Sequence, residues 1–157
     1  FSPVVLPELS MPHSLAFLAT LSLLLAAPPV VAEMPRIELT TGFYRIDAEV
    51  AADNPHRMRG LMHRRSMAAN QGMLFVFPLA ANHCMWMRNT LLPLSVAFLD
   101  EDGRILNIEN MQPQTEDNHC AVKAARYALE MNLGWFSSKG IKPGAHIGGI
   151  EKAPAPQ

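Results

Sequence analysis

Two cysteines occur in this sequence, and each ends the same tripeptide, Asn-His-Cys, at residues 82–84 and 118–120. Two Cys and two His could form a zinc site, but adjacent residues on a strand point to opposite faces of a sheet. Structural zinc sites also usually separate paired ligands by two to four residues. The first 32 residues, discussed below, predict export to an oxidising compartment, where paired cysteines are usually bonded. We therefore favour a disulfide between Cys84 and Cys120, with free or metal-bound thiols as the alternatives.

The stretch around the first cysteine could bind copper instead. If it is a strand, His83, Met85 and Met87 share one face, because side chains alternate. Imidazole and thioether groups are ligands that suit Cu(I). Methionine also fills gaps in hydrophobic cores, so we predict no metal and keep these three residues as the alternative metal site.

Arginine is distributed unevenly along the chain. Residues 54–99 contain five Arg and no acidic residue, whereas residues 100–117 contain six acidic residues and one Arg. The guanidinium group binds carboxylate or phosphate through two parallel hydrogen bonds. We therefore predict a site for a small anionic ligand or peptide, and the structural alternative is pairing with acids, with Asp100, Glu116 and Glu130 as candidates. The predicted ligand-binding residues are Arg59, Arg64, Arg88, Asn89 and Thr90.

Composition excludes little beyond nucleic-acid binding. The 157 residues are 49% hydrophobic and carry 13 basic and 14 acidic side chains, so no overall charge favours nucleic acid or an anionic membrane. The sequence has no G-x-S-x-G elbow, phosphate loop or dinucleotide fingerprint. We accordingly predict no catalytic residue and no cofactor, and we leave open an enzyme of unknown class.

The first 32 residues are typical of an export signal. An apolar run from Leu15 to Ala27 is broken by two prolines and ends in small residues, which predicts a start at Met11 and cleavage after Ala32. The run is shorter than the about 20 residues of a spanning helix. We expect a periplasmic or secreted bacterial protein without a stable membrane span after cleavage, and an uncleaved anchor is the alternative.

The remaining chain predicts one domain, residues 33–151, followed by a disordered Pro/Ala tail, residues 152–157. Residues 54–55, Asn-Pro, indicate the start of a helix, and Asp102-Gly103 indicates a hairpin turn. Period-two alternation and short apolar runs predict strands near residues 44–50, 73–77, 94–99, 104–111, 127–133 and 145–150, and a short helix is expected at 135–139.

Four stretches of the chain resemble one family, the domain of unknown function 192, which is common in exported bacterial proteins. They are residues 57–64, RMRGLMHR; 72–77, GMLFVF; 86–94, WMRNTLLPL; and 129–135, LEMNLGW. The resemblance spans about residues 37–150. It implies a small, β-rich α+β domain with a strongly bent or barrel-like, mainly antiparallel sheet and one or two short helices. It implies no established reaction.

The chain departs from the family pattern at two positions. Ser95 stands where the family usually carries Asp, and Met85 stands where it often carries an aromatic residue. Three hypotheses therefore remain: a monomeric, non-catalytic binding module with an arginine-lined cleft, a periplasmic Cu(I) carrier, or an enzyme.

Overall fold

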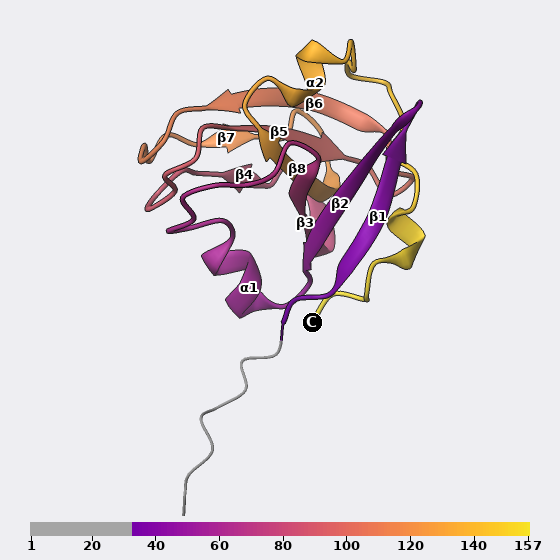
Figure 1. The fold of residues 1–157 in the computed structure, drawn as a ribbon. Coiled ribbons are helices and arrows are strands. Elements are labelled where there is room, and N and C mark those ends of the chain that lie inside the picture. Colours follow the sequence, from indigo (N-terminus) through magenta and orange to yellow (C-terminus); the bar gives the residue numbers. More distant parts are fainter. Residues whose placement is uncertain (1–32) are drawn as a thin grey trace, which may run out of the picture. The chain divides into compact units, whose positions relative to one another are not determined.

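The computed structural model describes residues 33–157, so the predicted signal peptide lies outside the described residues. Its centre is a six-stranded sheet in the order β1-β2-β3-β8-β5-β6, in which only β2 and β3 are parallel (Figure 1). The elements are β1 (Arg36–Thr41), β2 (Tyr44–Ala51), α1 (Asn54–Arg59), β3 (Gln71–Ala81), β4 (Cys84–Met85), β5 (Leu94–Leu99), β6 (Ile105–Met111), β7 (His119–Cys120), β8 (Ala125–Asn132), α2 (Trp135–Ser138) and a 3-10 turn, η1 (Ile150–Lys152).

The predicted α+β class and the mainly antiparallel sheet are confirmed, together with two short helices. The barrel-like expectation is not confirmed, because the sheet stays open, with β1 and β6 at its two ends. Residues 36–41, for which we predicted no strand, form β1, which pairs with β2 along six residues.

Strand β8 is the central strand, hydrogen-bonded to β3 on one side and to β5 on the other. Its alternate residues face two separate hydrophobic clusters. Leu129 and Met131 join the cluster that α2 covers, whereas Ala128 joins the cluster that contains Phe75 and Leu61. Both faces of the strand are therefore buried, and an even-numbered residue of β8 is as enclosed as an odd-numbered one.

The C-terminal part of the domain ties down both edges of the sheet. The predicted strand at residues 145–150 is reduced to two isolated bridges, Gly148 with Thr40 and His146 with Arg104, before η1 begins. Residues 152–157, for which we expected no fixed structure, contact the domain where the Gln157 amide donates to the Ala52 carbonyl at 2.8 Å.

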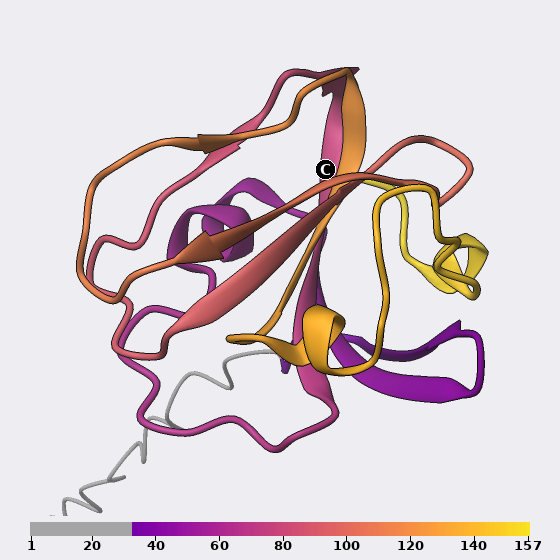
Figure 2. The same ribbon diagram turned by 90° about the horizontal axis from the view of Figure 1, so that it is seen from above.

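A second, two-stranded ribbon pairs β4 with β7. Cys84 lies directly opposite Cys120, and the two form a disulfide with a Cα–Cα distance of 4.0 Å, so the predicted bond is confirmed. Figures 1 and 2 both show this ribbon on the same side of the sheet as α1.

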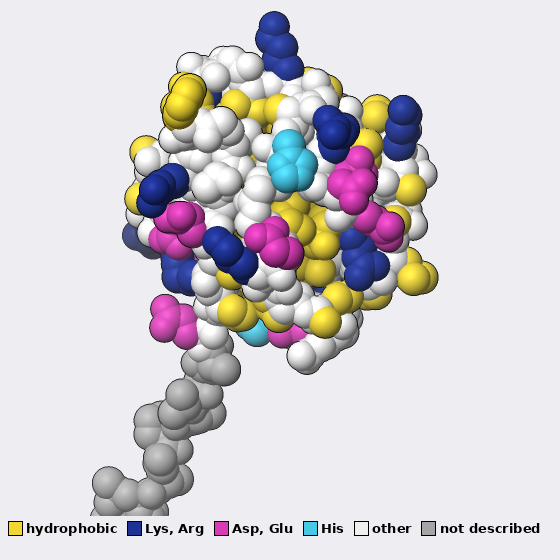
Figure 3. All heavy atoms as spheres, turned by 90° about the vertical axis from the view of Figure 1, so that its right-hand side faces the viewer, with side chains coloured by type: hydrophobic (Ala, Val, Ile, Leu, Met, Phe, Trp, Pro, Cys, Tyr) yellow, Lys and Arg dark blue, Asp and Glu magenta, His cyan; other side chains and the backbone are white. Residues whose placement is uncertain are grey.

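The surface carries both signs of charge. On the face shown in Figure 3, basic and acidic side chains are interspersed around a hydrophobic area. Within residues 33–157, no helix has the length and apolar character needed to cross a membrane.

Candidate functional site

Helix α1 is short because its two ends are fixed by local chemistry. The Asp53 side chain accepts a hydrogen bond from the His56 amide at 2.9 Å, and Pro55 fits the first turn. Asp53 is therefore the N-cap, one residue before the Asn-Pro pair that predicted the helix start. The helix ends at Gly60, where φ is +48°, and an added Cβ would lie 3.2 Å from the Phe75 ring. This close approach lays the end of α1 directly on β3.

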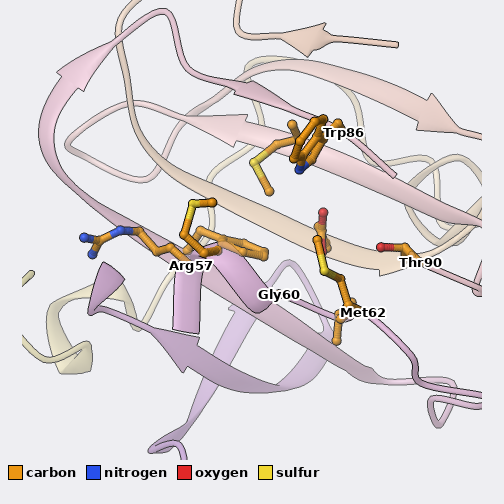
Figure 4. Close-up of a pocket in the computed structure, with 10 residues that line it drawn as sticks. Arg57, Gly60, Met62, Trp86 and Thr90 are labelled. Carbon is orange, nitrogen blue, oxygen red and sulfur yellow. The ribbon is translucent and has the colours of Figure 1, made fainter. Parts of the chain in front are cut away.

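The turn after α1 and the segment after β4 form the walls of a pocket over the sheet, which we call the Glu130 pocket (Figure 4). It is an open hollow of about 270 Å³, a volume that includes solvent space at its mouth. Half of its lining residues also line a wider depression of about 610 Å³. The Glu130 pocket is lined by Arg57, Met58, Gly60, Leu61, Met62, Phe75, Met85, Trp86, Thr90 and Glu130.

Glu130 lies in the middle of the sheet, with Met73 of β3 and Val96 of β5 as its cross-strand neighbours. The residue is only 4% exposed. Burial raises the pKa of its carboxyl from 4.5 to about 8, because the charged form is desolvated. The carboxyl is therefore mostly protonated at pH 7.

No residue in the range 33–157 hydrogen-bonds the Glu130 carboxyl, whereas every fully enclosed side-chain oxygen or nitrogen in that range has a partner. The Glu130 oxygens are therefore not sealed in the core, and they reach the pocket that they help to line. Buried polar groups are normally paired, so an unpaired carboxyl facing a pocket points to a ligand or solvent partner.

The disulfide holds the opposite wall in place. It joins β4 to β7 immediately before Met85 and Trp86, both of which line the pocket. Outside the pocket, the Arg88 guanidinium lies 5.6 Å from the centroid of the Trp86 ring. Trp86 thus lines the pocket and also has a cation near its ring.

The arginines predicted to bind an anion have different surroundings. Arg64 forms an ion pair with the half-buried Glu49, and Arg88 lies 3.6 Å from Glu116, one of the acidic partners that we considered. Arg59 is exposed and makes no ion pair or side-chain hydrogen bond within residues 33–157. Of the arginines, Arg57 is the one that lines the pocket.

The other two predicted ligand-binding residues follow Arg88. Asn89 adopts a φ of +54°, and its carbonyl accepts a hydrogen bond from the His63 amide at 2.9 Å. Thr90 is buried and lines the pocket, and its hydroxyl donates to the Arg88 carbonyl at 3.2 Å. The structure thus brings one of the five predicted residues, Thr90, into the pocket.

The alternative copper residues have three different environments. Met87 is fully buried in the cluster around Phe75, and Met85 lines the pocket. His83 stacks on Phe77 with 3.8 Å between ring centroids, and its Nε2 lies 2.8 Å from the Leu79 carbonyl oxygen. Copper binding by these three residues stays the alternative to our prediction of no metal. Among residues 33–157, no group of three or more His, Cys, Asp and Glu is arranged to hold a metal ion.

Glu130 was missing from the residues that we predicted to bind ligand. The alternation of side chains along the predicted strand put Glu130 on the less apolar face, opposite Leu129 and Met131. The available signal was its position as the one acid in residues 118–150, inside an otherwise apolar segment. Met58 lies in α1 and Met62 lies in the turn after it, and both line the pocket.

Comparison with known proteins gives a family and no activity. No protein with a curated description matches the chain significantly. One similar protein, described as a proposed transcription regulator from Sinorhizobium meliloti 1021, has a crystal structure. Its sequence is 36% identical to this chain, and the two structures have a TM-score of 0.68 over 74% of this chain and 95% of that one. A protein of unknown function from Novosphingobium aromaticivorans DSM 12444 is 30% identical, with a TM-score of 0.67 over 78% of this chain and 90% of that one.

The family model is DUF192, described as "Uncharacterized ACR", and it matches residues 37–149. This range contains α1, the disulfide ribbon and all six strands of the central sheet except the first residue of β1. The chain therefore belongs to the DUF192 family.

Proposed function

We propose that this protein is a binding module that takes a small organic ligand in the Glu130 pocket. The observation that carries the proposal is the buried carboxyl of Glu130, which faces a pocket without a protein partner. A group held in this way costs stability, and a ligand that pairs with it offsets that cost.

The stretches that resemble the family also support the Glu130 pocket as the binding site. Each of the four stretches that resemble the family contributes to the pocket: residues 57–64 supply the α1 wall, 72–77 supply Phe75, 86–94 supply Trp86 and Thr90, and 129–135 supply Glu130. The stretches come from separate parts of the chain. A shared pocket is a direct reason for one sequence to contain all four.

Methionine methyl groups provide the test. In protein labelled with 13C at the methionine methyls, a panel of small amines, alcohols and carboxylates should include compounds that shift the signals of Met58, Met62 and Met85. The methyl of Met131, which lies in the other hydrophobic cluster, is the internal control. If no compound moves the three pocket methyls at millimolar concentration, the pocket is not a binding site for small ligands.

The arginine-lined anion cleft predicted from the sequence stays a prediction. Arg64 and Arg88 each have a carboxylate partner, Glu49 and Glu116, which favours the structural role for these two. If the cleft exists, phosphate should raise the melting temperature of the wild type, and Arg88→Lys should abolish that rise. We therefore assign the binding role to the pocket and not to the arginines.

Export remains part of the proposal. The Cys84–Cys120 disulfide supports it, since such bonds persist in oxidising compartments. Protein recovered from the periplasm or medium should begin at or near Glu33 when its N-terminus is sequenced. Recovery of an intact Met11 terminus in the membrane fraction would contradict signal cleavage.

An acid–base enzyme is the second candidate, and one observation favours it. A carboxyl with a pKa of about 8 is suited to donate and accept protons near neutral pH. A turnover screen of the wild type against Glu130→Gln tests this role, because a general acid or base loses its activity when the carboxyl becomes an amide.

A further inference from the structure

Two polar groups of the Glu130 pocket can accept hydrogen bonds from a ligand, the Thr90 hydroxyl and the ionised Glu130 carboxyl. The Thr90 hydroxyl uses its hydrogen on the Arg88 carbonyl, so its lone pairs are what remain for a ligand. The Glu130 carboxyl, once ionised, offers acceptor oxygens alone. A ligand that satisfies both groups must therefore be rich in N–H or O–H donors.

The apolar walls are of a kind that also attracts cations. Trp86 and Phe75 present aromatic rings, whose faces bind ammonium groups. Met58, Met62 and Met85 present polarisable thioethers. Aromatic and thioether groups accommodate the alkyl part of a ligand as well as its charge.

Arg57 is the other charged residue among those that line the pocket, and its charge is used elsewhere. Its guanidinium donates to the carbonyls of Ala52, Val76 and Gln157. Figure 4 shows the Arg57 side chain extending away from Trp86, Met62 and Thr90. It therefore borders the pocket without supplying a cation to its centre.

We propose that the Glu130 pocket binds a small primary ammonium ion, with Glu130 as its counter-ion, Thr90 as a second acceptor, and the Trp86 and methionine walls around its alkyl chain. This inference rests on the proposed function, and it names the class of ligand. The predicted anion is thus replaced at this pocket by a ligand of the opposite charge.

Binding then includes a defined proton transfer. In the free protein the Glu130 carboxyl holds a proton; on binding, that proton leaves to solvent, the carboxylate pairs with the ammonium group, and the amine stays protonated. The affinity should rise about tenfold per pH unit below pH 8 and level off above it. Glu130 and Arg57 are the titratable groups in the pocket lining, and Met73 and Val96 flank Glu130 in the sheet, so no other lining group titrates with it.

Three probes of equal chain length separate charge from shape: n-butylammonium, 1-butanol and butyrate. We expect n-butylammonium to shift the Met58, Met62 and Met85 methyl signals of the wild type, with a dissociation constant at least about tenfold below those of the other two at pH 8. That constant should fall about tenfold from pH 6 to pH 7. Glu130→Gln, which resembles the protonated carboxyl in shape, should remove both the preference and the pH dependence. Glu101→Gln, in the exposed β5–β6 turn, is the matched control and should change neither.

The outcomes distinguish this inference from the proposed function. If 1-butanol or butyrate moves the pocket methyls as strongly as n-butylammonium, the pocket binds small ligands but the ammonium assignment is wrong. The assignment is equally wrong if Glu130→Gln binds n-butylammonium as tightly as the wild type does. If Glu130→Gln does not fold, the wild type alone tests the ammonium assignment. The assignment is then wrong if n-butylammonium does not have the lowest dissociation constant of the three probes, or if that constant does not fall as the pH rises. If no probe and no panel compound moves the pocket methyls, both proposals fail.

Discussion

Replacing Glu130 by glutamine should remove a loss of stability that the buried carboxyl imposes at neutral and alkaline pH. The folded state keeps the Glu130 proton up to a pKa of about 8, whereas the unfolded chain releases it near 4.5. The folded state thus binds more protons between these values, and stability falls as the pH rises through this window. Each pKa unit corresponds to about 1.4 kcal/mol. The buried carboxyl therefore lowers the free energy of unfolding by an amount on the order of 3 kcal/mol at pH 7 and on the order of 5 kcal/mol above pH 8.

Urea unfolding without reductant, at pH 5, 7 and 9, measures this effect. The free energy of unfolding of Glu130→Gln minus that of the wild type should grow by several kcal/mol from pH 5 to pH 9. Other groups that titrate, such as Asp47 and Glu49, are common to both proteins and cancel in the difference. Glu101→Gln should follow the wild type at every pH. A difference that stays constant within about 1 kcal/mol would show that the carboxyl is solvated in the folded state.

Three further predictions concern the scaffold around the pocket. Replacing Cys84 and Cys120 by serine should lower the free energy of unfolding by about 4 kcal/mol in the chain-entropy model. The reason is that the disulfide closes a loop with a sequence separation of 36. Urea unfolding midpoints with and without reductant measure this change. Glu49→Gln should cost about 1–2 kcal/mol at pH 7, because two arginines hydrogen-bond the carboxylate and lower its pKa; this difference should shrink as the pH falls below 4.5, the ordinary value. Gly60→Ala should lower the melting temperature more than Gly42→Ala does, because both glycines have positive φ but only at Gly60 would an added Cβ meet the aromatic ring of β3; equal losses would contradict the close contact.

Most strands could be predicted because their pattern is local. Alternation over residues 44–50 predicts β2, and the apolar run at residues 94–99 predicts β5. The Cys84–Cys120 bond was also predictable, because two cysteines allow one pairing within the chain and we expected an oxidising compartment. β1 was missed because the alternation of Ile37 and Leu39 with Arg36 and Glu38 covers only a few residues. The strand is stabilised mainly by its pairing with β2.

The position of Glu130 could not be predicted, because its burial depends on non-local elements. Alternation identifies β8 as a strand and separates its two faces, but it does not reveal that β8 is central. The sheet face that carries Glu130 is covered by the residues after α1 and by Met85 and Trp86. All of these lie 44 or more positions before Glu130 in the sequence. The disulfide that holds this cover in place adds a constraint that no periodicity contains.

The place of β8 has a consequence for the order in which the domain can fold. In the chain, β8 follows every other strand of the sheet, yet in space it separates β3 from β5. Until it is available, β1-β2-β3 and β5-β6 are two separate groups of strands, each with an unpaired apolar edge. Contacts of such long sequence separation make folding slow and cooperative. A chain that stops before residue 125 lacks the strand that joins the two groups, so the native sheet forms only when nearly the whole domain is present.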